Sequence, residues 1–266
     1  MAAAPLLNIA VRAARRAGDL IVRHLDRRDT LKVSSKQHND FVSEVDRLAE
    51  ADIIETVRRS YPDHAFLAEE SGENGSGEVR WIIDPLDGTT NFLHGFPVFA
   101  VSIAVEVRGR LEHGVVYDPL RQELFTASRG AGAQLDGRRV RVSACRELAP
   151  ALLGTGFPFR DHRRLDAYLA MFKTLVEKTA GLRRPGAAAL DLAYVAAGRL
   201  DGFFELGLKP WDIAAGALLI QEAGGLVGDL NGGVDYLASG DVLAANPKLF
   251  QVLAKELAVA RKTNAT

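Results

Sequence analysis

Apolar residues recur with helical spacing at the start of the chain and again after Ser43. In the segment 5–27, Leu7, Ala10, Val11, Ala14, Ile21 and Leu25 fall on one face of a helix. The segment 43–61 carries a similar stripe, which ends before Pro62 because proline cannot continue a helix. The pattern predicts an amphipathic helix in each segment. The polar residues 28–43 between them are expected to form a loop or a loose hairpin.

Short apolar runs bounded by turn residues predict strands in the middle of the chain. They cover residues 64–68, residues 79–84 and several stretches between 96 and 130. Turns are expected at Arg108-Gly109, Asp118-Pro119 and Asp136-Gly137.

The second half of the chain alternates helical and extended patterns. Helices are expected over residues 162–181, from about residue 189, after Pro210 and over residues 246–262, with strands between them. Because the blocks lack a strict βαβ rhythm, we expect a layered α/β or α+β fold with sheets sandwiched between helices. The pattern changes near residue 150, from mainly strand signals before it to alternating helix and strand signals after it. This change predicts two α/β halves, 1–150 and 151–266, within one compact unit.

The composition narrows the class of protein. With 47% hydrophobic and 25% charged residues, the chain is typical of a globular protein, and its net charge of −1 gives no general attraction to nucleic acid or anionic membranes. No apolar run reaches the roughly 18 residues of a membrane span, and the N-terminus lacks the pattern of a signal peptide. The single cysteine, Cys145, excludes a disulfide within the chain. We expect a soluble cytoplasmic protein with no membrane partner.

The stretch WIIDPLDGTTN, residues 81–91, carries the most specific candidate chemistry. Pro85 fixes the backbone after an apolar strand, so Asp84, Asp87 and the carbonyl of Leu86 can face one point. Such an all-oxygen set suits a hard cation such as Mg²⁺. Gly88 and Thr89 begin a helical turn whose N–H groups can bind an anion. The alternative is an ordinary turn capped by aspartate, and the motif by itself leaves both readings open.

Other acidic positions also have two readings each. Glu69 and Glu70 follow a short strand, where adjacent side chains point to opposite sides, so only one is expected to enter a site. Both could instead belong to a solvated turn. Asp212 either caps the alanine-rich helix after Pro210 or projects from it as a metal ligand. Asp46, at the start of the second predicted helix, has the same alternatives.

Three stretches together resemble the inositol monophosphatase family: residues 81–105, FLAEESG (66–72) and KPWDIAAGALLIQEAGG (209–225). The matching order and spacing run from Asp40 to about Asn246. The N-terminal LLNIAVRAARRAGDLI and residues 183–212 are especially similar to bacterial SuhB-type members of that family. The resemblance implies a helix–sheet–helix–sheet–helix sandwich of the sugar-phosphatase type.

The resemblance also implies roles for particular residues. Those matching metal ligands, for two or three Mg²⁺ per site, are Glu69, Asp84, Leu86, Asp87 and Asp212. The catalytic positions are Thr89, Asp46 and Glu69, of which Thr89 and Asp46 match the pair that activates the attacking water. Substrate contacts are implied for Asp87, Gly88, Thr89, Arg183 or its neighbour Arg184, Ala188, Glu205 and Asp212. Pro185 and Ala187 stand where relatives often carry small hydroxyl residues, so one substrate-side hydrogen bond is expected to be missing.

The implied reaction is Mg²⁺-dependent hydrolysis of inositol monophosphate to inositol and phosphate, with sensitivity to lithium. Related substrates stay open: fructose 1,6-bisphosphate, histidinol phosphate or a nucleotide 3′-phosphate. The resemblance further implies a homodimer and a second role with RNA polymerase and Nus factors in antitermination at ribosomal RNA operons. The near-neutral charge and the lack of an aromatic RNA-binding motif argue against a direct nucleic-acid site.

Overall fold

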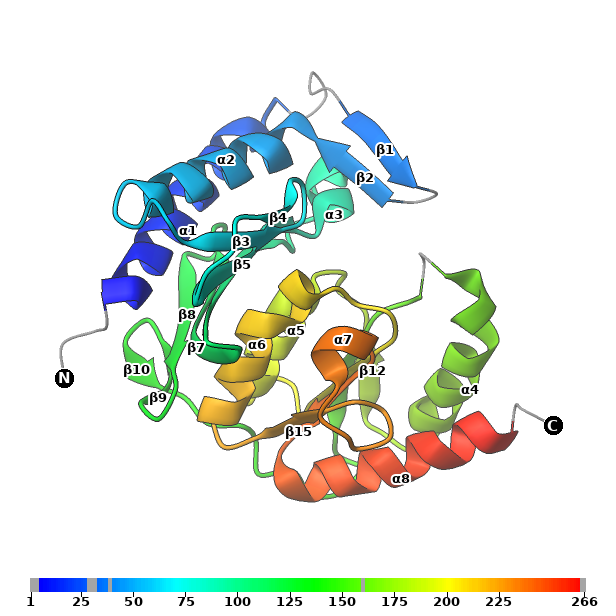
Figure 1. Cartoon of the computed structure of the whole chain (residues 1–266). Coiled ribbons are helices and arrows are strands. Elements are labelled where there is room, and N and C mark those ends of the chain that lie inside the picture. Colours follow the sequence, from blue (N-terminus) through cyan, green and yellow to red (C-terminus); the bar gives the residue numbers. More distant parts are fainter. Residues whose placement is uncertain (1–4, 28–32, 38–39, 159–160, 264–266) are drawn as a thin grey trace.

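The computed structural model describes residues 5–27, 33–37, 40–158 and 161–263 (Figure 1). The first half contains α1 (Pro5–Leu25), β1 (Val33–Gln37), β2 (Asp40–Ser43), α2 (Glu44–Arg58), β3 (Ala65–Ala68), β4 (Gly72–Asn74), β5 (Val79–Asp87), α3 (Thr89–His94), β6 (Ala100–Val107), β7 (Arg110–Asp118), β8 (Glu123–Ser128), β9 (Gly132–Leu135) and β10 (Arg138–Arg139). The second half contains β11 (Leu152–Thr155), the 3₁₀ turn η2 (His162–Arg164), α4 (Leu165–Val176), β12 (Gly181–Arg183), α5 (Ala188–Ala196), β13 (Gly202–Glu205), α6 (Pro210–Glu222), β14 (Leu226–Gly228), α7 (Tyr236–Ser239), β15 (Val242–Ala245) and α8 (Pro247–Thr263).

Two large sheets and a hairpin organise the chain. The eight-stranded sheet has the order β10-β9-β8-β7-β6-β5-β3-β4, and the five-stranded sheet has the order β12-β11-β13-β15-β14. In the larger sheet β3 and β5 are parallel and the other neighbours are antiparallel. In the smaller sheet β11 runs parallel to both β12 and β13, whereas β15 is antiparallel to β13 and β14.

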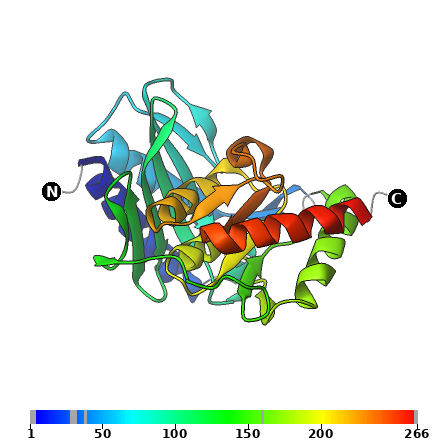
Figure 2. The same cartoon turned by 90° about the horizontal axis from the view of Figure 1, so that it is seen from below.

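The helices and sheets form five layers. Helices α1 and α2 cover one face of the larger sheet, and α5 and α6 lie between the two sheets (Figure 1). Helices α4 and α8 cover the outer face of the smaller sheet, with α8 running along that side in Figure 2. The predicted helix–sheet–helix–sheet–helix sandwich is therefore confirmed. The two sheets fall on opposite sides of residue 150, but the division into halves there stays a prediction.

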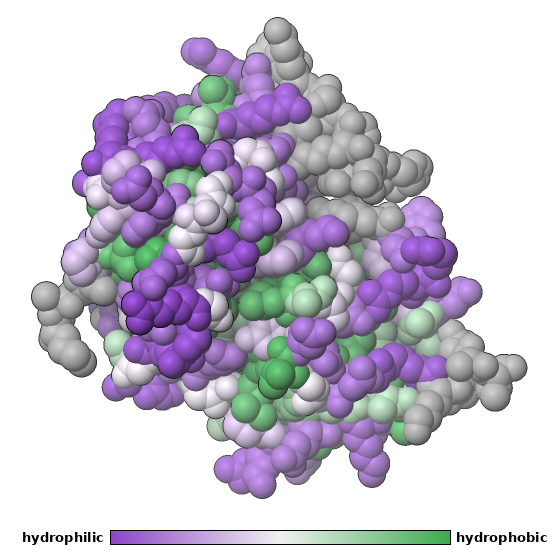
Figure 3. All heavy atoms as spheres, in the orientation of Figure 1, coloured by the Kyte–Doolittle hydropathy of each residue, from purple (hydrophilic) through white to green (hydrophobic). Residues whose placement is uncertain are grey.

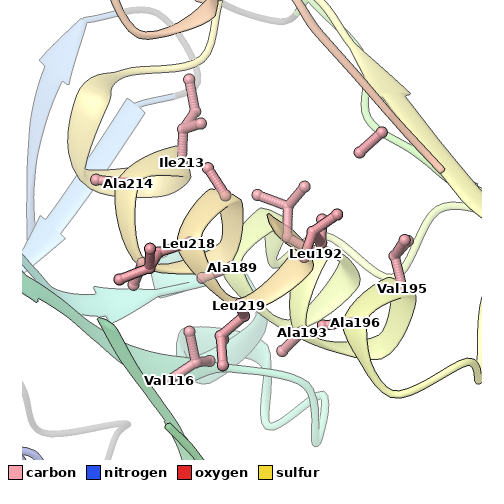
Figure 4. Packing of buried hydrophobic residues seen from close by; sticks show 14 of the residues in the cluster. Val116, Ala189, Leu192, Ala193, Val195, Ala196, Ile213, Ala214, Leu218 and Leu219 are labelled. Atoms are coloured by element: carbon pink, nitrogen blue, oxygen red, sulfur yellow. The ribbon is translucent and has the colours of Figure 1, made fainter. Parts of the chain in front are cut away.

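Helices α5 and α6 form the central layer because their residues are small and apolar. Figure 4 shows their side chains packed together, with Leu219 of α6 near Val116 of β7. A side chain at Gly216 would come within 2.5 Å of the Cβ of Leu192, so glycine is needed where the two helices touch. The close packing holds the N-terminal ends of both helices beside the end of β5.

Helix α2 begins at a reciprocal cap. Ser43 is its N-cap, and its hydroxyl accepts a hydrogen bond from the amide of Val45 at 3.2 Å. The carboxylate of Asp46 accepts the Ser43 amide at 2.8 Å, which completes a capping box. The predicted apolar stripe is buried on the sheet side, with Val45, Ile53 and Val57 fully enclosed.

Several details differ from the sequence expectations. Strand β5 does not end at Pro85 but continues to Asp87, with an irregular register against β6 between Asp84 and Asp87. Helix α4 is shorter than the predicted segment at both ends, because residues 162–164 form the 3₁₀ turn η2 and the helix ends at Val176. Strands β4 and β12 and helix α7 were not predicted. The segment 28–43 is a hairpin of β1 and β2 in its described part, and residues 28–32 and 38–39 lie outside the described residues.

Hydrophilic residues predominate on the face shown in Figure 3, and hydrophobic ones gather in the middle of that view, around α6 and α7. Within the described ranges, every helix is too short or too polar to cross a membrane.

Candidate active site

A cavity of about 290 Å³ lies where the end of β5 meets the N-terminal ends of α3, α5 and α6. Its walls are rich in acids: Glu69, Asp84, Asp87, Asp191, Glu205 and Asp212. Leu86 and the turn from Gly88 to Asn91 also line the cavity. All five positions expected to ligate metal therefore meet in one cavity.

Asp84 and Asp87 are positioned by the irregular end of β5. The amide of Leu86 donates to Asp84 Oδ1 at 3.0 Å, which closes a turn over Pro85. Asp84 pairs with Ser102 of β6 and Asp87 with Ala100, so two residues of β5 lie unpaired between them. This bulge lets both carboxylates reach the cavity, as bulges often do beside functional sites.

The Asp87 carboxylate also joins the first half of the chain to the second. Its Oδ2 accepts the amide of Ala189 at 2.7 Å, in the first turn of α5. A helix N-terminus carries partial positive charge, so α5 favours the ionised form of this carboxylate. Asp87 thus caps a helix and lines the cavity at once.

Asp212 combines the same two roles on α6. Its Oδ2 accepts the amide of Lys209, the N-cap residue, at 2.7 Å. Asp212 also lines the cavity and is only 6% exposed. One position of the Asp212 side chain therefore lets it bond the start of the helix and line the cavity.

Thr89 lines the cavity and is hydrogen-bonded to Asp46, which is not among the lining residues. Thr89 Oγ1 lies 2.7 Å from Asp46 Oδ1 and 3.1 Å from the carbonyl oxygen of Leu86. Asp46 is fully buried, and Ser43 bonds its other oxygen through both amide and hydroxyl, at 2.8 and 2.5 Å. Burial raises the pKa of Asp46, while the bonds from Ser43 and Thr89 work in the opposite direction.

Gly88, the N-cap of α3, is required by backbone geometry. Its φ of +96° is unfavourable for other residues, and a Cβ there would come within 2.9 Å of the carbonyl oxygen of Val98. Glycine was expected here because it lets an anion approach the backbone. The structure adds a second reason, since a side chain at this position would clash with Val98.

Only one glutamate of the Glu69-Glu70 pair lines the cavity. Glu69 follows β3, and its amide bonds to the carbonyl of Ile83 at 3.1 Å, next to Asp84. The amides of Glu70 and Ser71 donate to the buried carboxylate of Glu50, each at 2.8 Å. The backbone on both sides of Glu69 is thereby held, and Glu70 lines a separate groove over α2.

The electrostatics of the cavity indicate a need for positive charge. Burial, followed by the charges of Glu69, Asp87 and Asp212, raises the pKa of Asp84 well above its usual value. The pKa of Asp87 is also raised well above its usual value, first by burial and then by Asp212. A divalent cation would offset this repulsion, and an all-oxygen donor set fits Mg²⁺.

The carboxylates are not drawn together into a finished metal centre. In the part of the chain that the structure describes, no group of three or more Asp, Glu, His or Cys side chains could hold a metal ion as it stands. Like charges repel, so these side chains would have to turn toward a cation when it binds. The oxygen donors fit Mg²⁺, and rotation of the carboxylate side chains would complete its coordination.

The substrate side of the cavity is formed by the second half of the chain. Ala188 and Glu205 line it, as expected. Of the two neighbouring arginines, Arg184 lines the cavity, whereas Arg183 bonds the carbonyl of Leu182 at 3.0 Å and is absent from the lining. Arg184 also lies over the ring of Phe157, 4.8 Å from its centroid.

Asn91, a residue that the sequence did not single out, connects α3 to the loop before α5. Its amide nitrogen lies 2.7 Å from the carbonyl of Val98 and 2.9 Å from that of Pro185. Ala187, where a hydroxyl was expected to be missing, is the N-cap of α5 and makes no capping bond through its side chain. The first turn of α5 is bonded by Asp87 instead.

Asp191 was also missed. It lies on α5, is 1% exposed and faces the cavity, and burial raises its pKa well above the usual value. A lone acid in the apolar run ALDLAY was the available signal, because an unpaired acid is rarely buried without a reason.

Comparisons with known proteins identify the family of the chain. Residues 2–262 match the inositol monophosphatase family. The Nus factor SuhB of Pseudomonas aeruginosa is 60% identical over 255 residues, 94% of each chain. The crystal structure of the extragenic suppressor protein SuhB from Bartonella henselae has a TM-score of 0.93 at 46% identity, covering 96% of this chain and 98% of that one. The IMPase of Thermotoga maritima has a TM-score of 0.90 at 33% identity, covering 98% and 100%. The chain belongs to the inositol monophosphatase family.

Proposed function

We propose that the protein is a Mg²⁺-dependent phosphomonoesterase that hydrolyses inositol monophosphate to inositol and phosphate. The observation that carries the proposal is the meeting of Glu69, Asp84, Asp87 and Asp212 in one cavity, beside the bonded pair Thr89–Asp46. The family match supports the same reaction class.

The metal ligands we propose are Glu69, Asp84, the Leu86 carbonyl, Asp87 and Asp212. Bound Mg²⁺ supplies charge for the phosphate oxygens, a more acidic water and support for the leaving oxygen. The protein's part is mainly positioning, because phosphoryl transfer needs little covalent chemistry.

Thr89 and Asp46 are proposed to prepare the attacking water. When Asp46 is ionised, the Thr89 hydroxyl donates its one hydrogen to Asp46 Oδ1, so its lone pairs can accept a hydrogen bond from water. As the water attacks phosphorus, its proton moves to Thr89 Oγ1 while the threonine proton moves to Asp46. The bond between phosphorus and the inositol oxygen breaks, and the inositol alkoxide takes a proton from a second water. The buried bonds from Ser43 keep Asp46 fixed during this transfer.

The substrate is proposed to bind through both halves of the cavity. Gly88 and Thr89 bind the phosphate, while Ala188, Glu205 and Arg184 contact the polyol. Family resemblance further leads us to propose inhibition by lithium and assembly as a homodimer.

Substrate identity is tested with a panel assayed by released phosphate at saturating Mg²⁺. The panel contains inositol 1-phosphate, fructose 1,6-bisphosphate, histidinol phosphate and a nucleotide 3′-phosphate. We expect the highest kcat/KM for inositol 1-phosphate. A higher value for any of the other three would reassign the substrate within the same reaction class.

A second candidate function is a cytoplasmic interaction role in transcription antitermination. The observation that favours it is the name Nus factor carried by the 60% identical relative from Pseudomonas aeruginosa. The test is co-elution of the purified chain with RNA polymerase and Nus factors, for the wild type and for an inactive Asp84→Asn variant. Co-elution of both would support a role separate from catalysis, and elution of both apart from the polymerase would count against it.

A further inference from the structure

A second pair of acids, Asp191 on α5 and Glu205 at the end of β13, lines the cavity apart from the expected metal ligands. Both are nearly enclosed, with exposed fractions of 1% and 6%. Their charges interact, because Glu205 is the largest charged influence on Asp191. Two buried acids that repel each other are unfavourable unless another group binds to them.

Gly156, just after β11, makes room for the Glu205 carboxylate. A Cβ at Gly156 would lie 2.0 Å from an oxygen of Glu205, whereas a Cβ at Gly154 would first meet Leu200 at 2.9 Å and Phe203 at 3.1 Å. Thr155, between the two glycines, lies 3.2 Å from the hydroxyl of Tyr168.

One oxygen of Asp191 has no hydrogen-bond partner among the residues that the structure describes. Oδ1 is fully buried and unbonded, although the residue lines the cavity. Buried polar atoms are rarely left unpaired, because an unpaired one loses its hydrogen bonds to water and gains none in return. Arg184 also lines the cavity, and its charge offsets part of the repulsion that Glu205 and Asp87 exert on Asp191. What Oδ1 itself lacks is a hydrogen-bond donor.

We propose that Asp191 Oδ1 accepts a hydrogen bond from a hydroxyl of the substrate's polyol, so that Asp191 sets specificity together with Glu205. The inference rests on the proposed phosphatase function and adds a contact to it. Sites built to bond a hydroxyl discriminate strongly against analogues that lack it. The ligand class is a neutral polyol phosphate, as opposed to an aryl or an aminoalkyl phosphate.

The test compares kcat/KM for inositol 1-phosphate, its monodeoxy analogues, phenyl phosphate and aminopropyl phosphate. In Asp191→Ala, the preference for inositol 1-phosphate over phenyl phosphate is expected to fall about tenfold, the effect of one lost hydrogen bond. The ratio of wild-type kcat/KM to Asp191→Ala kcat/KM should be about ten for inositol 1-phosphate. For the monodeoxy analogue that lacks the bonded hydroxyl, the same ratio should be about one. Asp191→Asn keeps the volume and an oxygen acceptor, so it should retain folding and most of the preference.

The matched control is Asp201→Asn. Asp201 accepts the amide of Leu152 at 2.7 Å, at the other end of β11, and is not among the residues lining the cavity. Its substitution should leave the preference between substrates unchanged. Thermal unfolding of each variant checks that it is folded.

Four results would overturn the inference: an equal loss on every substrate, an unchanged preference in Asp191→Ala, a loss in Asp191→Asn as large as that in Asp191→Ala, or a wild-type preference for aminopropyl phosphate. A wild-type protein that hydrolyses none of the esters would instead overturn the proposed function. The two failures are therefore distinguishable.

Discussion

Thr89 Oγ1 donates a 2.7 Å hydrogen bond to Asp46 Oδ1, joining residues 43 positions apart in the sequence. Asp46 belongs to the capping box of α2, whereas Thr89 begins α3 at the end of β5. A helix cap and the proposed water-activating pair therefore share one carboxylate. Changes at either residue should affect catalysis more than folding.

Thr89→Val removes the hydroxyl and keeps the shape of the side chain. We expect kcat to fall by about 10²–10⁴, the usual contribution of a positioned acid–base group. Thr89→Ser, which keeps the hydroxyl, should lose far less. The measurement is steady-state phosphate release from inositol 1-phosphate. Equal activity of the valine and serine variants would show that the hydroxyl takes no part.

Asp46→Asn should lower kcat through the same pair, and the double variant with Thr89→Val should lose little more than the worse single variant. Residues that act as a unit are non-additive in this way. The cap bond to the Ser43 amide is also weakened, so the free energy of unfolding should fall by about 1 kcal/mol. Additive losses in kcat would contradict the pairing.

Stability without metal should fall as pH rises. Burial and the neighbouring acids raise the folded-state pKa of Asp84 and Asp87 well above 3.8, so the folded chain binds more protons than the unfolded chain. Their stabilising contribution is full below the unfolded pKa of about 4 and is lost as pH rises through the folded pKa values. Thermal unfolding in EDTA, measured upward from pH 5, should show this decline for the wild type. The decline should be weaker for Asp87→Asn, which titrates one group fewer.

Mg²⁺ should reverse this trend, because it binds the ionised carboxylates. At a Mg²⁺ concentration near 100 times Kd, Tm should rise by roughly 5 °C or more at pH 8, and by less at pH 5. A Mg²⁺-induced rise that is the same at both pH values would indicate that these carboxylates are not the ligands.

Gly156→Ala tests the position of Glu205. The added Cβ would meet the carboxylate end of Glu205 at 2.0–2.2 Å, and this flexible end can move where backbone could not. We expect a folded protein with KM for inositol 1-phosphate raised about tenfold, which corresponds to the loss of one hydrogen bond. The change in KM for phenyl phosphate should be smaller. Gly77→Ala is the control, because its Cβ would meet nothing closer than 3.6 Å. An unchanged KM in Gly156→Ala would mean that Glu205 does not contact the polyol.

The layered fold and most helices were predictable because apolar periodicity reports which face of an element is buried. The order of strands in the larger sheet was not, since it depends on pairings between residues far apart in the chain. The continuation of β5 through Pro85 was missed because proline by itself favours the end of a strand. A bulge accommodates it here.

The candidate site was predictable where local motifs carry it, as in residues 84–89. The alternatives for Asp46 and Asp212 could not be separated from sequence, and the structure shows both residues bonded to the N-termini of helices beside the cavity. Asp191 and Asn91 were missed because their roles arise from contacts with distant segments. The Asp87–Ala189 bond, across 102 positions, is the clearest such case.

The measurement that tests the central claim most directly is Mg²⁺-dependent phosphate release from inositol 1-phosphate by the wild type and Asp87→Asn. Asparagine can still accept the Ala189 amide, so the variant should fold while losing a proposed ligand. We predict turnover by the wild type with Mg²⁺, none in EDTA, and loss of most activity in Asp87→Asn. Turnover in EDTA, or wild-type-like turnover by Asp87→Asn, would contradict the account.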